Sequence, residues 1–81
     1  MADPNQDAFM HLNNFLARHK VPLHSVIEWS ENTPNGLVWH AQLLILGYIY
    51  GGRGWTKMLA KNQAAAGALY VLRGSYSGIA N

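Results

Sequence analysis

Residues 54–65 read Gly54-Trp55-Thr56-Lys57-Met58-Leu59-Ala60-Lys61-Asn62-Gln63-Ala64-Ala65. Thr56 is a good N-cap residue, so we expect a helix to begin with it. Lys57 and Lys61 are four residues apart and therefore share one face of that helix. Lysines in a first turn oppose the helix dipole, whose positive end also lies there. The dipole, the backbone N–H groups and the ammonium groups together favour an anion such as phosphate.

The residues around this stretch set the limits of the expected helix. Alanine recurs at positions 60, 64, 65 and 68, and side chains this small let a helix lie close against a sheet. We expect the helix to span about residues 56–72 and to stop at Gly74, which leaves residues 75–81 as a flexible tail. Before the helix, residues 51–54 read Gly-Gly-Arg-Gly, which predicts a turn.

Hydrophobic periodicity predicts a second helix near the amino end. Apolar side chains recur at helical spacing over residues 4–19. Asp3 is placed as a cap, Pro4 suits the first helical position, and Gln6 stands where a capping-box partner would be. A strand rich in β-branched and aromatic side chains follows at residues 24–30.

Two more strands are expected after a turn at residues 32–36. The second strand runs over residues 37–46, Gly47 breaks it, and residues 48–50 form a short third strand. Alternation along the second strand gives one apolar face, made of Leu37, Trp39, Ala41, Leu43 and Ile45. The other face is mixed.

The predicted fold is α+β, with the element order α-β-β-β-α. Three consecutive strands favour an antiparallel meander, and both helices need one sheet face to cover their apolar stripes. We therefore predict a two-layer sandwich of a three-stranded antiparallel sheet with both helices on one face. The 81 residues allow a single domain over residues 1–81.

Composition narrows the class of protein. No apolar run is long enough to span a membrane, so no membrane is expected as a partner. The polar, acidic amino end argues against a signal peptide, and the sequence has no cysteine, so we expect an intracellular location, cytoplasmic or nuclear. The net charge of +2 is low for a protein that binds nucleic acid mainly by electrostatics.

Catalytic, metal and cofactor signals are missing from the sequence. The four histidines share no usual metal-ligand spacing, and no cysteine accompanies them. Only four acidic residues are present, and no Gly-x-Ser-x-Gly nucleophile turn occurs. We therefore expect no catalytic residue, no metal and no cofactor, and a protein that is not an enzyme.

Three motifs occur in the order and spacing of a known family. Leu12-Asn13-Asn14-Phe15 resembles a first-helix Leu-Asn-Glu-Tyr signature, and Pro22 follows at the expected distance. Residues 39–47 fit a Phe-x3-Val-x-Val-x-Gly strand. Residues 56–65 resemble a Ser-Lys-Lys-x-Ala-Lys-x-x-Ala-Ala helix start. From about residue 9 to residue 72, the chain resembles the double-stranded-RNA-binding domain.

This resemblance implies a partner and a set of contacts. Such domains bind the sugar-phosphate outline of A-form RNA over about 16 base pairs, reading shape more than sequence. It implies that Lys57 and Lys61 clamp phosphates and that Met10 and Asn14 face one minor groove. The loop residues implied to enter the next groove are Asn32, Thr33, Pro34 and Asn35. Double-stranded RNA is then the expected partner, in RNA processing or RNA silencing.

The chain also departs from the family pattern. Met58 stands where a second lysine is usual, Asn14 replaces a glutamate, and the strand loop has no histidine. Having fewer cationic side chains against the phosphates lowers affinity for RNA and flattens its salt dependence. Arg53 either adds a phosphate contact from the turn or is a plain surface residue.

A second hypothesis follows from these departures. A degenerate member of the family would mediate protein–protein contact, as a homodimer or with an RNA-processing protein partner. A contiguous apolar stripe on the uncovered sheet face, together with the apolar end of the second helix, would form the interface. The residues expected there are Val38, Leu44, Leu46, Leu69 and Tyr70.

Overall fold

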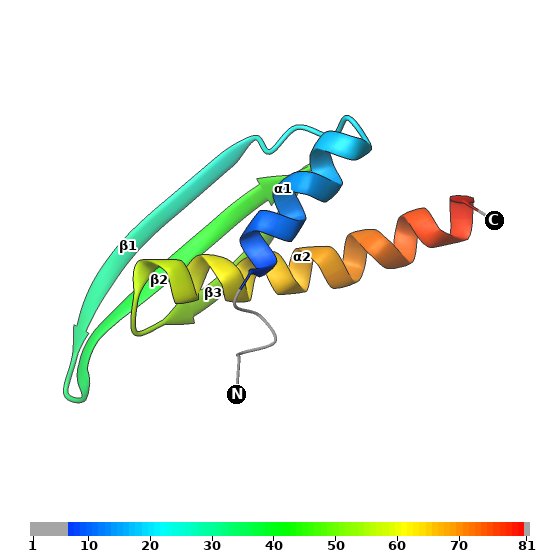
Figure 1. Cartoon of the computed structure of the whole chain (residues 1–81). Helices are drawn as coiled ribbons and strands as arrows, with labels where there is room; N and C mark the ends of the chain where they lie inside the picture. The colour runs from blue at the N-terminus through cyan, green and yellow to red at the C-terminus, as the bar shows by residue number, and fades with distance from the viewer. Residues whose placement is uncertain (1–6, 81) are drawn as a thin grey trace, which may run out of the picture.

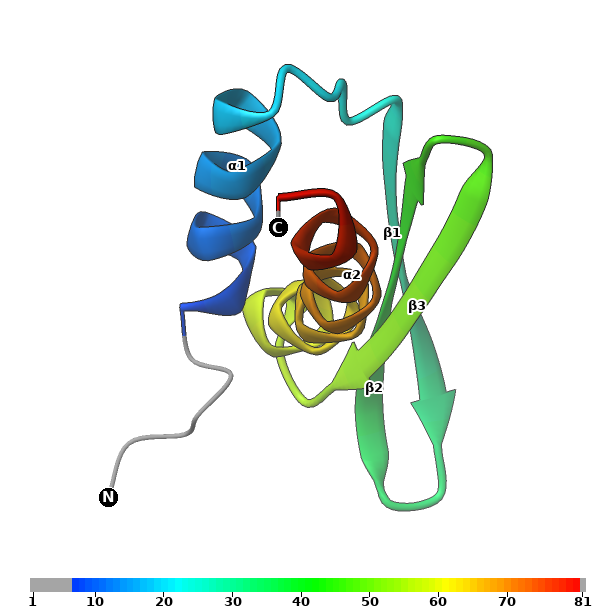
Figure 2. The same ribbon diagram turned by 90° about the vertical axis from the view of Figure 1, so that its right-hand side faces the viewer.

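The computed structural model describes residues 7–80 and confirms the predicted α+β sandwich. The strands form one antiparallel sheet in the order β1-β2-β3, and both helices lie on the same side of it (Figure 1, Figure 2). The elements are α1 (Ala8–Arg18), β1 (Ser25–Thr33), β2 (Gly36–Ile45), β3 (Tyr48–Gly54) and α2 (Lys57–Ala80).

The first helix begins later than the sequence predicts. Helix α1 starts at Ala8, next to Asp7, whose side chain makes no capping hydrogen bond. The predicted cap residues Asp3, Pro4 and Gln6 lie outside the described residues. The Phe9 N–H group, which belongs to the first turn, instead donates to the side-chain oxygen of Asn62 at 2.9 Å. A buried amide of α2 therefore satisfies one of the backbone donors that a helix start leaves open.

The loop between β1 and β2 is tighter than the predicted turn at residues 32–36. Thr33 pairs with Gly36, so only Pro34 and Asn35 lie in the turn, and Asn32 belongs to β1. The Thr33 hydroxyl donates to the Gly36 carbonyl at 2.6 Å and accepts from the Asn35 N–H group at 3.2 Å. The turn thus holds its shape through one threonine side chain, which the propensities of the turn residues do not reveal.

The alternation predicted along β2 is confirmed where the helices cover the sheet. Ala41, Leu43 and Ile45 are buried, whereas Trp39 is half-buried and Leu37 is 44% exposed. The hairpin of β1 and β2 extends beyond the helices, which explains why its apolar residues lose their cover (Figure 1). The core is completed from both helices by Ala8, Leu12, Leu16, Ala64, Ala65, Ala68, Leu69 and Leu72.

The predicted turn at residues 51–54 is wrong, because β3 continues through Gly54. Helix α2 lies directly on this part of the strand. A Cβ atom added to Gly52 would lie 2.5 Å from the Ala60 carbonyl oxygen, and one added to Gly54 would lie 2.6 Å from the Leu59 Cβ. These glycines are therefore strand residues that make room for a helix backbone. The expectation that small alanines bring α2 close to the sheet is confirmed.

Both ends of α2 bear on the sequence predictions. The Thr56 hydroxyl accepts a hydrogen bond from the Leu59 N–H group at 3.1 Å, which confirms the N-cap. The helix continues past Gly74 to Ala80, so the predicted stop is wrong. Gly74 does not adopt the positive φ of a helix-ending glycine. Flexibility of residues 75–81 stays a prediction, and Asn81 lies outside the described residues.

No described helix combines the length and apolarity needed to cross a membrane.

Candidate nucleic-acid interface

Three separate parts of the chain form the predicted interface. In both views the beginning of α2 lies between α1 and the tip of the β1–β2 hairpin (Figure 1, Figure 2). Met10 and Asn14 are exposed on α1, and Pro34 and Asn35 are exposed at the hairpin tip. The fold therefore brings the start of the lysine-bearing helix between the two elements that the resemblance assigns to successive minor grooves.

A first hollow joins α1 to the beginning of α2. Its volume is about 500 Å³, and Met10 and Asn14 line it from one side while Met58 and Asn62 line it from the other. Asn62 also holds α1 through the Phe9 N–H group. The predicted first-helix contacts thus lie beside Met58, the residue that replaces the second lysine of the family pattern. Asp7 also lines this hollow, which therefore offers amide, thioether and carboxylate groups and no cationic side chain.

A second hollow joins the hairpin to the end of β3. Thr33, Asn35, Arg53 and Trp55 line its volume of about 330 Å³, together with Val38. Trp55, a large aromatic side chain directly before the N-cap, is 61% exposed. The structure therefore brings two of the predicted loop residues together with Arg53.

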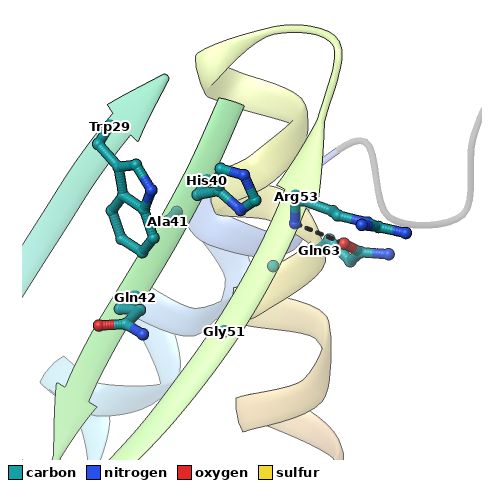
Figure 3. A pocket seen from close by; sticks show the side chains of 8 residues that line it. Trp29, His40, Ala41, Gln42, Gly51, Arg53 and Gln63 are labelled. Atoms are coloured by element: carbon teal, nitrogen blue, oxygen red, sulfur yellow. Dashed lines mark hydrogen bonds between the residues drawn. The ribbon is translucent and has the colours of Figure 1, made fainter. Parts of the chain in front are cut away.

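Arg53 itself lies on the sheet face that is turned away from the helices. It pairs with His40 and follows Gly52, whose missing side chain would point at α2. The Arg53 N–H group donates to the Gln63 side-chain oxygen at 2.6 Å, which ties the end of β3 to α2. The Arg53 side chain lies beside that of Gln63 of α2, and both line one shallow hollow (Figure 3).

The two lysines of the predicted clamp have different surroundings. Lys57 is exposed, and its Nζ atom lies 4.9 Å from the centroid of the Trp39 ring. Lys61 is half-buried, with Nζ 5.0 Å from the centroid of the Phe9 ring and 3.8 Å from Glu28 Oε2. One side of α2 carries both ammonium groups, as expected, but only the Lys61 charge is offset by a carboxylate among the described residues.

Apart from Glu28, the described carboxylate that lies toward the start of α2 is that of Asp7, which lines the first hollow together with Met58 and Asn62. The first turn of α2 contains no acidic residue. Glu31 is engaged on the opposite face of the sheet, where its Oε1 atom lies 2.9 Å from His40 Nε2. This distribution leaves the dipole of α2 and the Lys57 ammonium group as the positive features at the helix start.

The open face of the sheet carries the second candidate surface. Leu44 lies opposite Ile49, with Ile27 diagonally across from it, and Ile27 and Ile49 are 52% and 64% exposed. Beside them, the Trp29 and His40 rings stack with centroids 5.1 Å apart at the edge of a shallow hollow of about 430 Å³ (Figure 3). An uncovered group of large apolar side chains is typical of a contact surface.

The five residues predicted for a protein interface do not share one surface. Val38 and Leu44 are half-buried on the open face, but Leu46 lies in the β2–β3 turn with a φ of 52°. Leu69 is 6% exposed and belongs to the core, so it offers no surface to a partner, whereas Tyr70 is 83% exposed. Leu69 and Tyr70 point in different directions because successive residues of a helix are rotated about its axis.

No protein-family model matches the sequence, and no curated protein matches it. Within the described part of the chain, no group of three histidine, cysteine, aspartate or glutamate side chains is placed to hold a metal ion. The predicted interface consists mainly of lysine, asparagine and methionine side chains around a helix start. Lysine and asparagine side chains donate hydrogen bonds, and the lysine ammonium group attracts anions.

Proposed function

We propose that this chain is a double-stranded-RNA-binding module and not an enzyme. It would recognise the shape of an A-form duplex through phosphate and 2′-hydroxyl contacts, and would act in RNA processing or RNA silencing. The proposal rests on the resemblance of the motifs together with the placement of the residues that carry them.

One observation carries this proposal: the beginning of α2 lies between the exposed residues of α1 and the hairpin tip. In an A-form duplex, two successive minor grooves flank a major groove whose rims are phosphates. Lys57 and the N–H groups of the first turn would meet those phosphates. Met10 and Asn14 would meet one minor groove, and the turn at Pro34 and Asn35 the other.

The charges of the site predict moderate and salt-dependent binding. Each phosphate that a lysine neutralises changes the logarithm of the binding constant by about 0.9 per decade of salt for a B-form duplex. Lys57 is exposed and has no carboxylate in contact within the described residues, whereas Lys61 is already close to Glu28. We therefore expect a salt slope of about one to two from the lysines, well below that of strongly basic nucleic-acid binders.

A titration with a blunt RNA duplex of about 20 base pairs, at two salt concentrations, tests the proposal. A DNA duplex of the same sequence is the comparison, because it offers phosphates without 2′-hydroxyl groups. We expect tighter binding to RNA and affinity that falls as salt rises. Equal affinity for the two duplexes, or no binding to either, would contradict shape-selective recognition.

The double variant Lys57→Ala with Lys61→Ala locates the contact. It should weaken binding to the RNA duplex strongly and reduce the salt slope by up to about two. A control that removes the same charge is Arg18→Ala with Arg73→Ala, since both arginines are exposed and neither belongs to the first turn of its helix. A similar reduction in both double variants would indicate a general charge effect instead of a clamp.

The exposed isoleucines favour one alternative function, association with a second copy of the chain through the open sheet face. Ile27, Leu44 and Ile49 are adjacent there, and no described helix covers them. Two such faces would bury apolar area on both copies, which favours association by about 25 cal/mol per Å². This alternative predicts a dimer that forms whether or not RNA is present.

A further inference from the structure

Lys61 lies in surroundings that differ from those of an ordinary surface lysine. Its side chain is 19% exposed, and that of Glu28 is 25% exposed. The ammonium group lies between Phe9 of α1 and Glu28 of β1, at 5.0 Å from the ring centroid and 3.8 Å from Oε2. Side chains of α1, β1 and α2 therefore meet at this one charge.

Glu28 reaches Lys61 because of the register of the sheet. It pairs with Ala41, which pairs with Gly52, and both of these positions face α2. Its Oε2 atom is buried and has no hydrogen-bond partner within the described residues. A separation of 3.8 Å is an ion pair and too long for a hydrogen bond. A buried carboxylate oxygen without a donor is costly, so the Lys61 charge is its main compensation.

We propose that Glu28 competes with RNA phosphate for Lys61 and so lowers the affinity of the interface. This inference rests on the proposed function. A phosphate that approaches Lys61 meets a nearly neutral pair, and the carboxylate repels it at close range. Lys57 has no such partner in the described part of the chain and supplies most of the lysine contribution. Glu28 thereby weakens the binding of polyanions that interact with the site through charge alone.

The substitution Glu28→Gln tests this role, because glutamine keeps the size of the side chain and removes its charge. Titrated with the blunt RNA duplex, the variant should bind about fivefold more tightly, with a salt slope steeper by about one. The matched control is Glu31→Gln, since Glu31 is the other acidic residue of β1 and contacts His40 on the opposite face. The control should leave affinity for the duplex nearly unchanged.

The Lys61→Ala background separates competition from a general change in charge. There, Glu28→Gln should give little further gain, because the lysine that it releases is gone. Glu28→Thr serves as a second variant with a strand-forming residue, and circular dichroism shows whether each variant is folded. A gain that persists without Lys61, or an affinity no higher than that of the natural sequence, would overturn the role of Glu28.

Failure of this inference is distinguishable from failure of the proposed function. If the natural sequence binds the RNA duplex and Glu28→Gln binds no better, only the competition is wrong. If neither protein binds the duplex at either salt concentration, RNA binding and the competition fall together.

Discussion

Where β3 passes under α2, the two faces of the sheet differ in the size of the side chains that they tolerate. On the covered face, a Cβ atom added to Gly52 would meet the backbone of Ala60 and Ala64, so α2 leaves no room there for an added carbon. On the open face, Ile49 and other large apolar side chains are exposed. The comparison indicates that close contact fixes the position of α2, and with it the proposed RNA site, whereas the open face is free to serve another partner.

Two adjacent glycines of β3 provide the sharpest test of this difference. Gly52→Ala should reduce the free energy of unfolding by about 3 kcal/mol, because its Cβ would overlap the backbone of α2 at Ala60 and Ala64. Gly51→Ala should change it by less than about 0.5 kcal/mol, because its nearest neighbour is the Ala41 carbonyl oxygen at 3.9 Å. Urea unfolding followed by circular dichroism measures both.

Equal costs for the two alanine variants would mean that the contact between α2 and β3 is looser than the structure indicates. RNA titration extends the test, because displacement of α2 would move Lys57 relative to the hairpin. We therefore expect Gly52→Ala also to weaken duplex binding, while Gly51→Ala binds like the natural sequence.

The next largest difference in stability is expected between alanine variants of two neighbouring side-chain amides of α2. The side-chain oxygen of Asn62 accepts a hydrogen bond from the Phe9 N–H group, and that of Gln63 accepts one from the Arg53 N–H group. Asn62 is buried, so Asn62→Ala leaves the Phe9 donor without its partner and should cost about 2 kcal/mol of unfolding free energy. Gln63 is exposed, so water replaces its bond and Gln63→Ala should cost about 0.5 kcal/mol. Thermal and urea unfolding of the two variants check the ratio.

A larger cost for Gln63→Ala than for Asn62→Ala would mean that the hydrogen bond between β3 and α2 contributes more to stability than the one between α1 and α2. Amide hydrogen exchange at Phe9 gives an independent measure. Its protection should disappear in Asn62→Ala and persist in Gln63→Ala.

The sequence predicts the structure correctly where a short stretch contains the whole cause. The hydroxyl of Thr56 caps a helix that begins one residue later, so the signal and its effect are adjacent. The alternation that buries Leu43 and Ile45 is likewise a property of one strand. Local features of this kind are enough to predict the element order and the two-layer architecture.

Errors arise where a distant element determines the outcome. The intrinsic preference of glycine predicts a turn at residues 51–54, but α2 lies against Gly52 and Gly54 and requires glycine there within the strand. The Glu28–Lys61 pair joins residues far apart in the chain, and no spacing rule indicates that a strand carboxylate would approach the lysine of a later helix. The lysine positions are therefore predictable, but the difference between their surroundings is not.

The smallest effect on stability is expected for a substitution on the open face. The same substitution nevertheless tests whether this face mediates self-association. Ile49→Glu should change the free energy of unfolding by less than about 0.5 kcal/mol, because the side chain is 64% exposed. If two chains associate through this face, the charge should convert a dimer to a monomer in analytical ultracentrifugation. Tyr70→Glu, on the exposed side of α2, is the matched control and should leave association unchanged. A natural protein that sediments as a monomer at high concentration would remove the dimer hypothesis, and the open face would then be unnecessary for both the fold and self-association.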